Sequence, residues 1–388
     1  MPFMKKKIFT ICFIFLFSGC SVHDAINITQ AAVSGNPTAA FKSLAQSKTV
    51  AYAINPKRLS NDIKYINSFI EKISSVWGKD NVKTPKQKEY VKYMQNYKSR
   101  ALIDFDKGIV TIETIDLENS KKSLQNAIVT TLLLPDDPRA ADLFGTAKIK
   151  LGKTPYLLGE IKDNDNKNIR YEWRANKFAN FLLKTKYNQK SIKRDGKNIT
   201  ISYVKIPMVK DHASIRVSKF KPLVKKYAKK FDVSENLIYA IIKTESNFNQ
   251  FAVSSAGAFG LMQIVPSSAG KDAYKYAKGN SWTPSRSYLF DAKNNIELGS
   301  AYIQILNTKY LNGIYNKISK EYCIISAYNT GSGNVLKTFS TNRQKAKNII
   351  NQKTPLAVYN TLRNKLPYKE TRRYLKKVVT NKKDFVNL

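Results

Sequence analysis

The residues most able to do chemistry lie in the second half of this 388-residue chain, in short motifs that follow one another in order. The motifs are Glu245-Ser246 at the end of an apolar run, Gly260-Leu261-Met262-Gln263-Ile264, Ala327-Tyr328-Asn329, and Glu370-Thr371 with Tyr374. The first motif supplies one carboxylate, and amide and aromatic side chains follow it, with no histidine or cysteine nearby in sequence. This set of side chains favours general acid and base catalysis on a sugar over nucleophilic or metal chemistry.

Periodicity places Glu245 on the apolar face of a helix. It follows Ile242, Ile241 and Ile238 by three, four and seven residues, and residues at this spacing share a helix face. A carboxylate on such a face must be paired, solvated by a cleft, or protonated. Desolvation raises the pKa of an acid, which keeps a proton available near neutral pH. The alternative is a glutamate that turns to solvent or pairs with Lys243 or Arg286.

The motifs and their order resemble the lytic transglycosylases, lysozyme-like enzymes that cut peptidoglycan. Three further segments, two of them upstream, resemble a membrane-bound branch of that family: Ala101–Phe105, Leu132–Arg139 and Thr283–Ser287. The resemblance therefore covers nearly the whole chain after its N-terminal segment.

The resemblance implies a role for each motif. Glu245 would protonate the β-1,4 glycosidic oxygen between N-acetylmuramic acid and N-acetylglucosamine, and would then act as base on the C6 hydroxyl of the muramic residue. The product would be a 1,6-anhydro end, formed without water and without a cofactor. The implied substrate-binding residues are Ser254, Gln263, Tyr328, Asn329, Glu370 and Tyr374. The alternatives are core burial for Tyr328 and a surface ion pair for Glu370.

Two other functions stay open at the level of sequence. One is a goose-type muramidase, which hydrolyses the same bond, and the other is an inactive wall-binding scaffold. Hydrolysis normally needs a second carboxylate that positions water, and the sequence does not locate one. The presence of Glu245, Ser254, Gln263 and Tyr328 argues against loss of activity.

Histidine and charge content exclude several other classes. Only His23 and His212 occur, and there is no His-Glu-x-x-His pattern, so we expect neither a metal site nor a Ser-His-Asp triad. The formal net charge is +38, which favours polyanionic partners. No nucleic-acid-binding motif accompanies this charge. The resemblance implies peptidoglycan glycan strands as the partner, with cell-wall machinery proteins as further candidates, and we expect no nucleic acid.

The N-terminus predicts export. Lys5 to Lys7 precede an apolar run from Ile8 to Phe17, which is shorter than the roughly 20 residues that span a bilayer and is typical of a signal peptide. Small residues before Cys20 resemble a bacterial lipobox, which implies a lipid anchor at Cys20. The alternative is an ordinary secretory signal. The implied location is the periplasmic face of the outer membrane of a Gram-negative bacterium.

We expect two domains behind this leader. The predicted segments are a signal peptide (1–19), a tether (20–50), an α+β N-terminal domain with a small antiparallel sheet (51–212) and an all-α lysozyme-like catalytic domain (213–388). The elements expected in the first domain are helices over 56–77, 85–99, 124–134 and 173–187, β-hairpins over 101–115 and 191–207, and strand-like pieces over 156–161 and 169–171. After His212 we expect only helices, beginning with an amphipathic one over 220–231.

Overall fold

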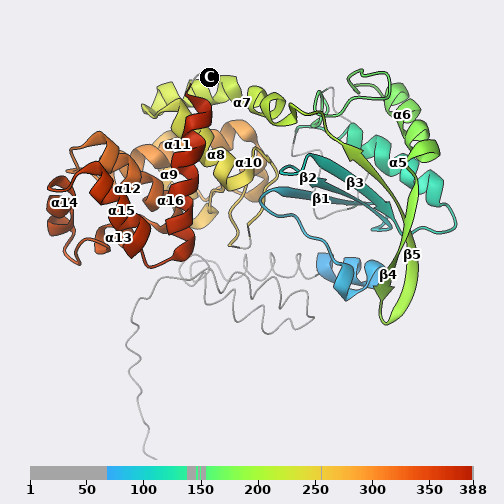
Figure 1. Ribbon diagram of the computed structural model, residues 1–388, viewed down its shortest axis with the longest axis horizontal. Coiled ribbons are helices and arrows are strands. Elements are labelled where there is room, and N and C mark those ends of the chain that lie inside the picture. Colours follow the sequence, from blue (N-terminus) through green and yellow to red (C-terminus); the bar gives the residue numbers. More distant parts are fainter. Residues whose placement is uncertain (1–67, 138–145, 147–148, 150–153, 255, 387–388) are drawn as a thin grey trace, which may run out of the picture.

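The computed structural model describes residues 68–137, 146, 149, 154–254 and 256–386. A sheet with flanking helices forms the first part of the chain, and helices alone form the second (Figure 1). The predicted signal peptide, Cys20 and the tether lie outside the described residues. Within the described ranges, no helix is both long and apolar enough to cross a membrane.

Five antiparallel strands form the sheet, in the order β1-β2-β3-β5-β4. The strands are β1 (Glu89–Met94), β2 (Ser99–Asp104), β3 (Ile109–Thr114), β4 (Asn188–Arg194) and β5 (Lys197–Pro207). Both predicted hairpins are confirmed, as β2-β3 and β4-β5. Helices α5 (Ser120–Leu132) and α6 (Glu172–Thr185), also expected, belong to the core on one face of the sheet, and a helix over residues 68–77 packs against the other.

Two expectations for this domain are wrong. Residues 85–99 were expected to be helical, but they contain β1, because Tyr90, Val91 and Tyr93 suit a strand that is buried on both faces. Left-handed backbone at Gln95–Tyr97 then turns the chain into β2. The pieces over 156–161 and 169–171 form no strands. The first of them makes only an isolated bridge, of Leu158 with Ile161, and residues 169–171 belong to no strand or bridge.

The second part is helical and has one core. Its α-helices are α7 (His212–Phe231), α8 (Glu235–Ser246), α9 (Lys271–Lys278), α10 (Arg286–Phe290), α11 (Ala292–Ile305), α12 (Lys317–Thr330), α13 (Ser332–Lys337), α14 (Arg343–Asn351), α15 (Pro355–Lys365) and α16 (Lys369–Lys382). The expected amphipathic helix is confirmed within α7, which begins earlier than 220. Helix α8 lies inside the bundle and packs against α7 and α16.

The segment after α8 joins the two parts. Phe251 is fully buried in the core of the first part, with its ring 5.4 Å from Tyr90 and 5.1 Å from Tyr156. The Asn249 amide donates to the Gln87 carbonyl (3.1 Å), and the Gln250 amide donates to the Asp136 carbonyl (2.8 Å). The sheet domain therefore packs directly against the loop that leaves the candidate catalytic helix.

Candidate active site

Helix α8 presents Glu245 in its last turn. The helix begins at Ser234, whose hydroxyl accepts a hydrogen bond from the Leu237 N–H, whereas Asp232 ends the preceding helix in a left-handed conformation. Asn247, also left-handed, ends α8. Ile238, Ile241 and Ile242 are fully buried on the same face as Glu245, which confirms the predicted core-facing position of this glutamate.

Burial controls the protonation of Glu245. The residue keeps part of its surface exposed, but its carboxyl group is enclosed, and desolvation raises its pKa to about 8. The hydroxyl of Tyr374 lowers this pKa and the charge of Glu370 raises it, both by less than desolvation. The carboxyl group is therefore protonated at neutral pH. The alternative partner Lys243 instead makes an ion pair with Asp384 at 2.7 Å.

Two buried tyrosine hydroxyls flank this acid. Tyr328 of α12 donates to the Met262 carbonyl (2.8 Å), and Tyr374 of α16 is 6% exposed. The pKa of each is raised well above the usual value, by burial first and by the charge of Glu245 second. The Tyr374 hydroxyl interacts with the Glu245 carboxyl, although the contact falls short of standard hydrogen-bond geometry, and it has no other partner among the described side chains and backbone.

The Gly-Leu-Met-Gln segment forms a turn in which the Gln263 side chain is bonded to backbone carbonyls. Gln263 has a left-handed backbone (φ 49°), and its amide donates to the carbonyls of Ala252 (3.2 Å) and Gly260 (2.9 Å). Its Oε1 atom is buried and accepts no hydrogen bond within the described part of the chain. Gly260 is required here, because φ is +77° and a Cβ would lie 2.2 Å from the Nδ2 of Asn295.

The three predicted site residues not yet described are Asn329, Glu370 and Ser254. Asn329 accepts from the Thr371 hydroxyl (2.7 Å) and so ties α12 to α16. Glu370 is exposed in the first turn of α16, where desolvation still raises its pKa. The Ser254 hydroxyl accepts from the Ala258 N–H (2.9 Å) inside a turn. Because Glu370, Tyr328 and Tyr374 all interact electrostatically with Glu245, the structure brings these three side chains together with the acid, whereas Asn329 and Ser254 have hydrogen-bond partners elsewhere.

Sequence reasoning missed two residues that hold this site. Asn295 is fully buried and joins three backbone groups: it accepts from the Met262 N–H (2.8 Å) and donates to the carbonyls of Phe259 (2.9 Å) and Leu289 (2.8 Å). Arg216, 2% exposed, donates to the Asn247 carbonyl (3.1 Å) at the end of α8. The available signal for Asn295 was its spacing in α11, where it lies three residues before Leu298 and therefore on the apolar face of that helix.

Nothing in the described ranges offers a metal site, since no three His, Cys, Asp or Glu side chains cluster in a way that would hold an ion. The arrangement is instead a single protonated carboxyl group beside two phenols. Such a group can donate a proton to a leaving oxygen and take one back afterwards.

Comparison with known proteins decides the family. Residues 52–219 match the model of the membrane-bound lytic murein transglycosylase C N-terminal domain, and residues 222–351 match the transglycosylase SLT domain. Proteins named membrane-bound lytic murein transglycosylase C from Yersinia pestis (strain Pestoides F) and Yersinia pseudotuberculosis (serotype O:1b, strain IP 31758) are each 45% identical over 321 residues, which is 82% of this chain and 88% of theirs. The chain belongs to this family.

Membership of the membrane-bound lytic murein transglycosylase C family, together with the observed sheet and helices, confirms the expected α+β domain followed by an all-α lysozyme-like domain. Among solved structures, the 70 kDa soluble lytic transglycosylase SLT70 from Escherichia coli is similar at 17% identity and a TM-score of 0.39. That match covers 95% of this chain and 52% of the other, so this chain spans about half the length of that protein.

Proposed function

We propose that Glu245 is the proton-transferring residue of a peptidoglycan lytic transglycosylase. The family gives the activity, because the relatives are named lytic murein transglycosylases and the chain carries their SLT domain. The observation that supports the residue assignment is the enclosed Glu245 carboxyl group, with a pKa of about 8, between Tyr328 and Tyr374. Such a group holds its proton at neutral pH and lies where a phenol can stabilise its anion.

The proposed reaction uses Glu245 twice. The protonated carboxyl group gives its proton to the β-1,4 glycosidic oxygen, and the bond from that oxygen to the muramic anomeric carbon breaks. The C6 hydroxyl of the same muramic residue then bonds to that carbon, and its proton returns to the Glu245 carboxylate. The intramolecular hydroxyl has a large effective concentration relative to water, and general acid catalysis contributes about 10² to 10⁴ in rate.

The remaining predicted residues are proposed to bind the sugars. The unpaired Oε1 of Gln263 would accept a hydrogen bond from a sugar hydroxyl or acetamido N–H. Tyr328, Tyr374 and Glu370 would contact the sugar at the acid. Asn329 would bind the sugar from the junction of α12 and α16, where it accepts a hydrogen bond from the Thr371 hydroxyl. Ser254 would bind the sugar from the turn in which its hydroxyl accepts a hydrogen bond from the Ala258 N–H.

The goose-type muramidase and the inactive scaffold are not favoured, because the relatives are named for lytic transglycosylation. The test is mass analysis of the fragments that the purified protein releases from peptidoglycan sacculi. We expect muramic ends that are lighter by one water than hydrolytic ends and that resist borohydride reduction, since they have no free anomeric centre. Digests dominated by reducible muramic ends would assign the chain to the muramidases.

The residue assignment has its own test in Glu245→Gln. The amide keeps the shape of the side chain but has no proton of suitable acidity to donate, so we expect a folded variant with cleavage reduced about 10² to 10⁴-fold. If Glu245→Gln showed an unchanged circular dichroism spectrum and kept most of the wild-type turnover, Glu245 would not be the proton-transferring residue.

The relatives are also named membrane-bound, and for this chain we propose that the attachment is a lipid on Cys20, which would hold the protein at the periplasmic face of the outer membrane. Each buried methylene of such a chain contributes about 0.8 kcal/mol to membrane binding. Cys20→Ala, expressed in a Gram-negative host, should lose lipid labelling and leave the membrane fraction. Retention of the variant in membranes at high salt would point to another anchor. Cell-wall machinery proteins remain proposed partners.

A further inference from the structure

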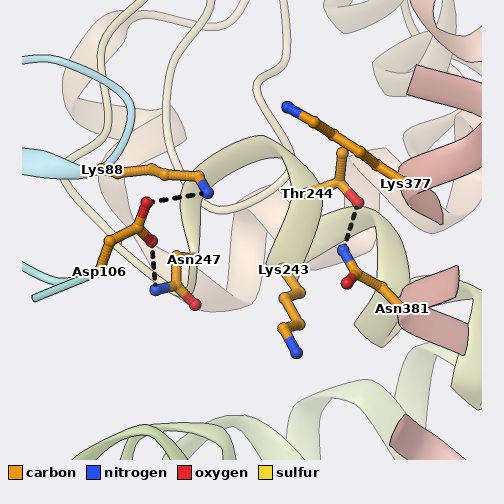
Figure 2. Close-up of a pocket in the computed structure, with 7 residues that line it drawn as sticks. All are labelled: Lys88, Asp106, Lys243, Thr244, Asn247, Lys377 and Asn381. Atoms are coloured by element: carbon orange, nitrogen blue, oxygen red, sulfur yellow. Dashed lines mark hydrogen bonds and ion pairs between the residues drawn. The ribbon is translucent and has the colours of Figure 1, made fainter. Parts of the chain in front are cut away.

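A basic hollow lies beside the candidate active site, between the sheet domain and two helices of the catalytic domain (Figure 2). It has a volume of about 260 Å³ and is lined by Lys88, Asp106, Lys243, Thr244, Asn247, Lys377 and Asn381. Four of these residues lie in helices α8 and α16, and Asn247 directly follows α8. Lys88 precedes β1, and Asp106 lies in the β2-β3 turn. The wall of this basic hollow therefore comes from both domains.

Cations outnumber anions in the lining, with three lysines and one carboxylate. Lys88 makes an ion pair with Asp106 (3.2 Å), and Lys243 makes one with Asp384 outside the hollow (2.7 Å). Lys377 makes no ion pair within 4 Å with any described residue, and it extends from α16 over Thr244 in Figure 2. The hollow thus holds an excess of positive charge, centred on Lys377.

The neutral side chains Asn247, Thr244 and Asn381 of the lining already make hydrogen bonds within the protein. The Asn247 amide donates to the Phe105 carbonyl (3.2 Å) and to the Asp106 carboxylate (2.8 Å). The Thr244 hydroxyl donates to the Ala240 carbonyl (2.7 Å) and accepts from Asn381 (2.9 Å). The donors left for a ligand are ammonium protons, because each lysine carries three. Such a site fits an anion better than a neutral sugar hydroxyl.

The basic hollow lies within reach of the acid. Lys377 lowers the pKa of Glu370, and the charge of Glu370 raises the pKa of Glu245, so the hollow and the acid have Glu370 as a common neighbour. Lys377 also follows Tyr374 by three residues, which corresponds to about 4.5 Å along α16. Asn381 follows Tyr374 by seven residues, or about 10.5 Å. An extended peptide advances roughly 3.3 Å per residue. A muramic residue at Glu245 that carries a peptide of two or three residues could therefore place a carboxylate in the hollow.

We propose that the basic hollow binds a carboxylate of the peptide stem on the muramic residue that Glu245 attacks. The proposal rests on the function proposed above and extends it, since it makes the stem peptide part of the recognised substrate. It also gives the sheet domain a direct role, because Lys88 completes the hollow from that side.

The test compares two substrates that share one glycan backbone. One is a set of glycan strands with stem peptides, and the other is the same set stripped of stems by an amidase. For each variant of the full-length protein, kcat/KM is measured on both substrates and expressed as the ratio of stem-bearing to stripped glycan. This ratio cancels effects on the glycosidic chemistry itself, including any effect of Lys377 on the pKa of Glu370.

We expect Lys377→Gln to lower this ratio about fivefold, since a charge-assisted contact at a partly solvated site is lost, and Lys88→Gln to lower it in the same direction. Lys377→Arg should keep most of the ratio, because it keeps the charge. The control is Lys225→Gln on the exposed face of α7, which should leave the ratio unchanged. An unchanged ratio in Lys377→Gln, or equal losses on both substrates, would overturn the proposal. Failure of the proposed function itself would be seen separately, as absence of anhydro ends from the wild-type digests of both substrates.

Discussion

At the scale of single residues, the proton on Glu245 determines when the site can act. Its pKa of about 8 results first from desolvation, so the acid form predominates at neutral pH and is lost above pH 8. We therefore expect kcat/KM to fall on the alkaline side with a midpoint near pH 8, measured by product release from soluble glycan. A profile that is flat from pH 6 to 9.5 would contradict the assignment of Glu245 as the proton donor.

The two neighbours of Glu245 should move that midpoint in opposite directions. The Tyr374 hydroxyl lowers the pKa of Glu245, and the charge of Glu370 raises it. Tyr374→Phe should therefore move the alkaline limb to higher pH, and Glu370→Gln should move it to lower pH. If the alkaline limbs of the two variants moved in the same direction, these side chains would act through general disruption of the fold and not through the charge of Glu245.

The raised pKa of Glu245 also has a cost in stability. In the unfolded chain this carboxyl ionises near its ordinary pKa of 4.5, whereas in the folded chain it keeps its proton to about pH 8. Between these values the native state binds more protons, so the free energy of unfolding falls as pH rises, by at most about 1.4 kcal/mol per pH unit. Glu245→Gln should remove this dependence. Urea unfolding of both proteins at pH 5 and pH 8 measures it, and identical pH slopes would contradict it.

Residue types and spacing were enough to predict the core-facing position of Glu245 but not the contacts around it. The isoleucine periodicity placed Glu245 on a buried face, and burial alone then raises its pKa. The role of Asn295 could not be predicted, because its three backbone partners lie 6 to 36 residues away in the sequence. Ser254 was expected to bind substrate, and spacing did not show that its hydroxyl accepts a hydrogen bond from the Ala258 N–H, which depends on turn geometry.

At the scale of elements, the loop after α8 is fixed by close packing against α11. A Cβ on Gly260 would lie 2.2 Å from the Asn295 side chain and 2.3 Å from the Leu289 carbonyl, with φ at +77°. We expect Gly260→Ala to lower the free energy of unfolding by about 3 kcal/mol, from backbone strain and overpacking together. It should also lower kcat, since Gln263 belongs to the same turn.

Gly279 provides the matched control for that prediction. It ends α9 at φ +80°, and a Cβ there would meet nothing within 4 Å. Gly279→Ala should therefore cost only the backbone term, about 1 kcal/mol, with unchanged kcat. Equal losses in the two variants, measured by chemical denaturation, would show that the packing against Asn295 is unimportant.

The elements themselves were predicted well where the pattern was local. The hairpin turns at Asp106-Lys107-Gly108 and Asp195-Gly196 and the apolar stripe of α7 depend on nearby residues, and all three were confirmed. Strand β1 was mistaken for a helix, because its Tyr and Val residues are buried on both faces and so lack the alternation of a half-exposed strand. Pairing with β2 decides that these residues form a strand and not a helix, and the spacing of residues in the sequence does not show that pairing.

At the scale of the whole molecule, a buried charge network joins the two domains. Arg216 of α7 makes an ion pair with Glu160 of the sheet domain (2.8 Å), and the two side chains are 2% and 1% exposed. Lys219 also contacts Glu160 (2.6 Å), and the Arg216 guanidinium lies over the Phe105 ring, 4.3 Å from its centroid. Because Arg216 also donates to the Asn247 carbonyl, this network connects the sheet domain to the end of α8.

This connection predicts that the two domains unfold together. Arg216→Met would leave Glu160 buried with only Lys219 as a charged partner, and removal of one member of a buried pair typically costs about 3 to 5 kcal/mol. We expect thermal unfolding of the wild-type chain to show one cooperative transition by calorimetry, and Arg216→Met to lower the whole transition. Since Asn247 lies two residues after Glu245, kcat should fall as well, even under conditions in which the variant remains folded.

The exposed pair of Lys177 with Asp165 is the matched control for Arg216. Its ion-pair distance is similar, 2.7 Å, but the side chains are 56% and 44% exposed, so water already solvates both charges. Lys177→Met should therefore change the free energy of unfolding by no more than about 1 kcal/mol and leave kcat unchanged. Two separate transitions in the wild-type scan, or equal effects of Arg216→Met and Lys177→Met, would mean that the domains are independent units. The position of Glu245 would then be set by the helical domain alone.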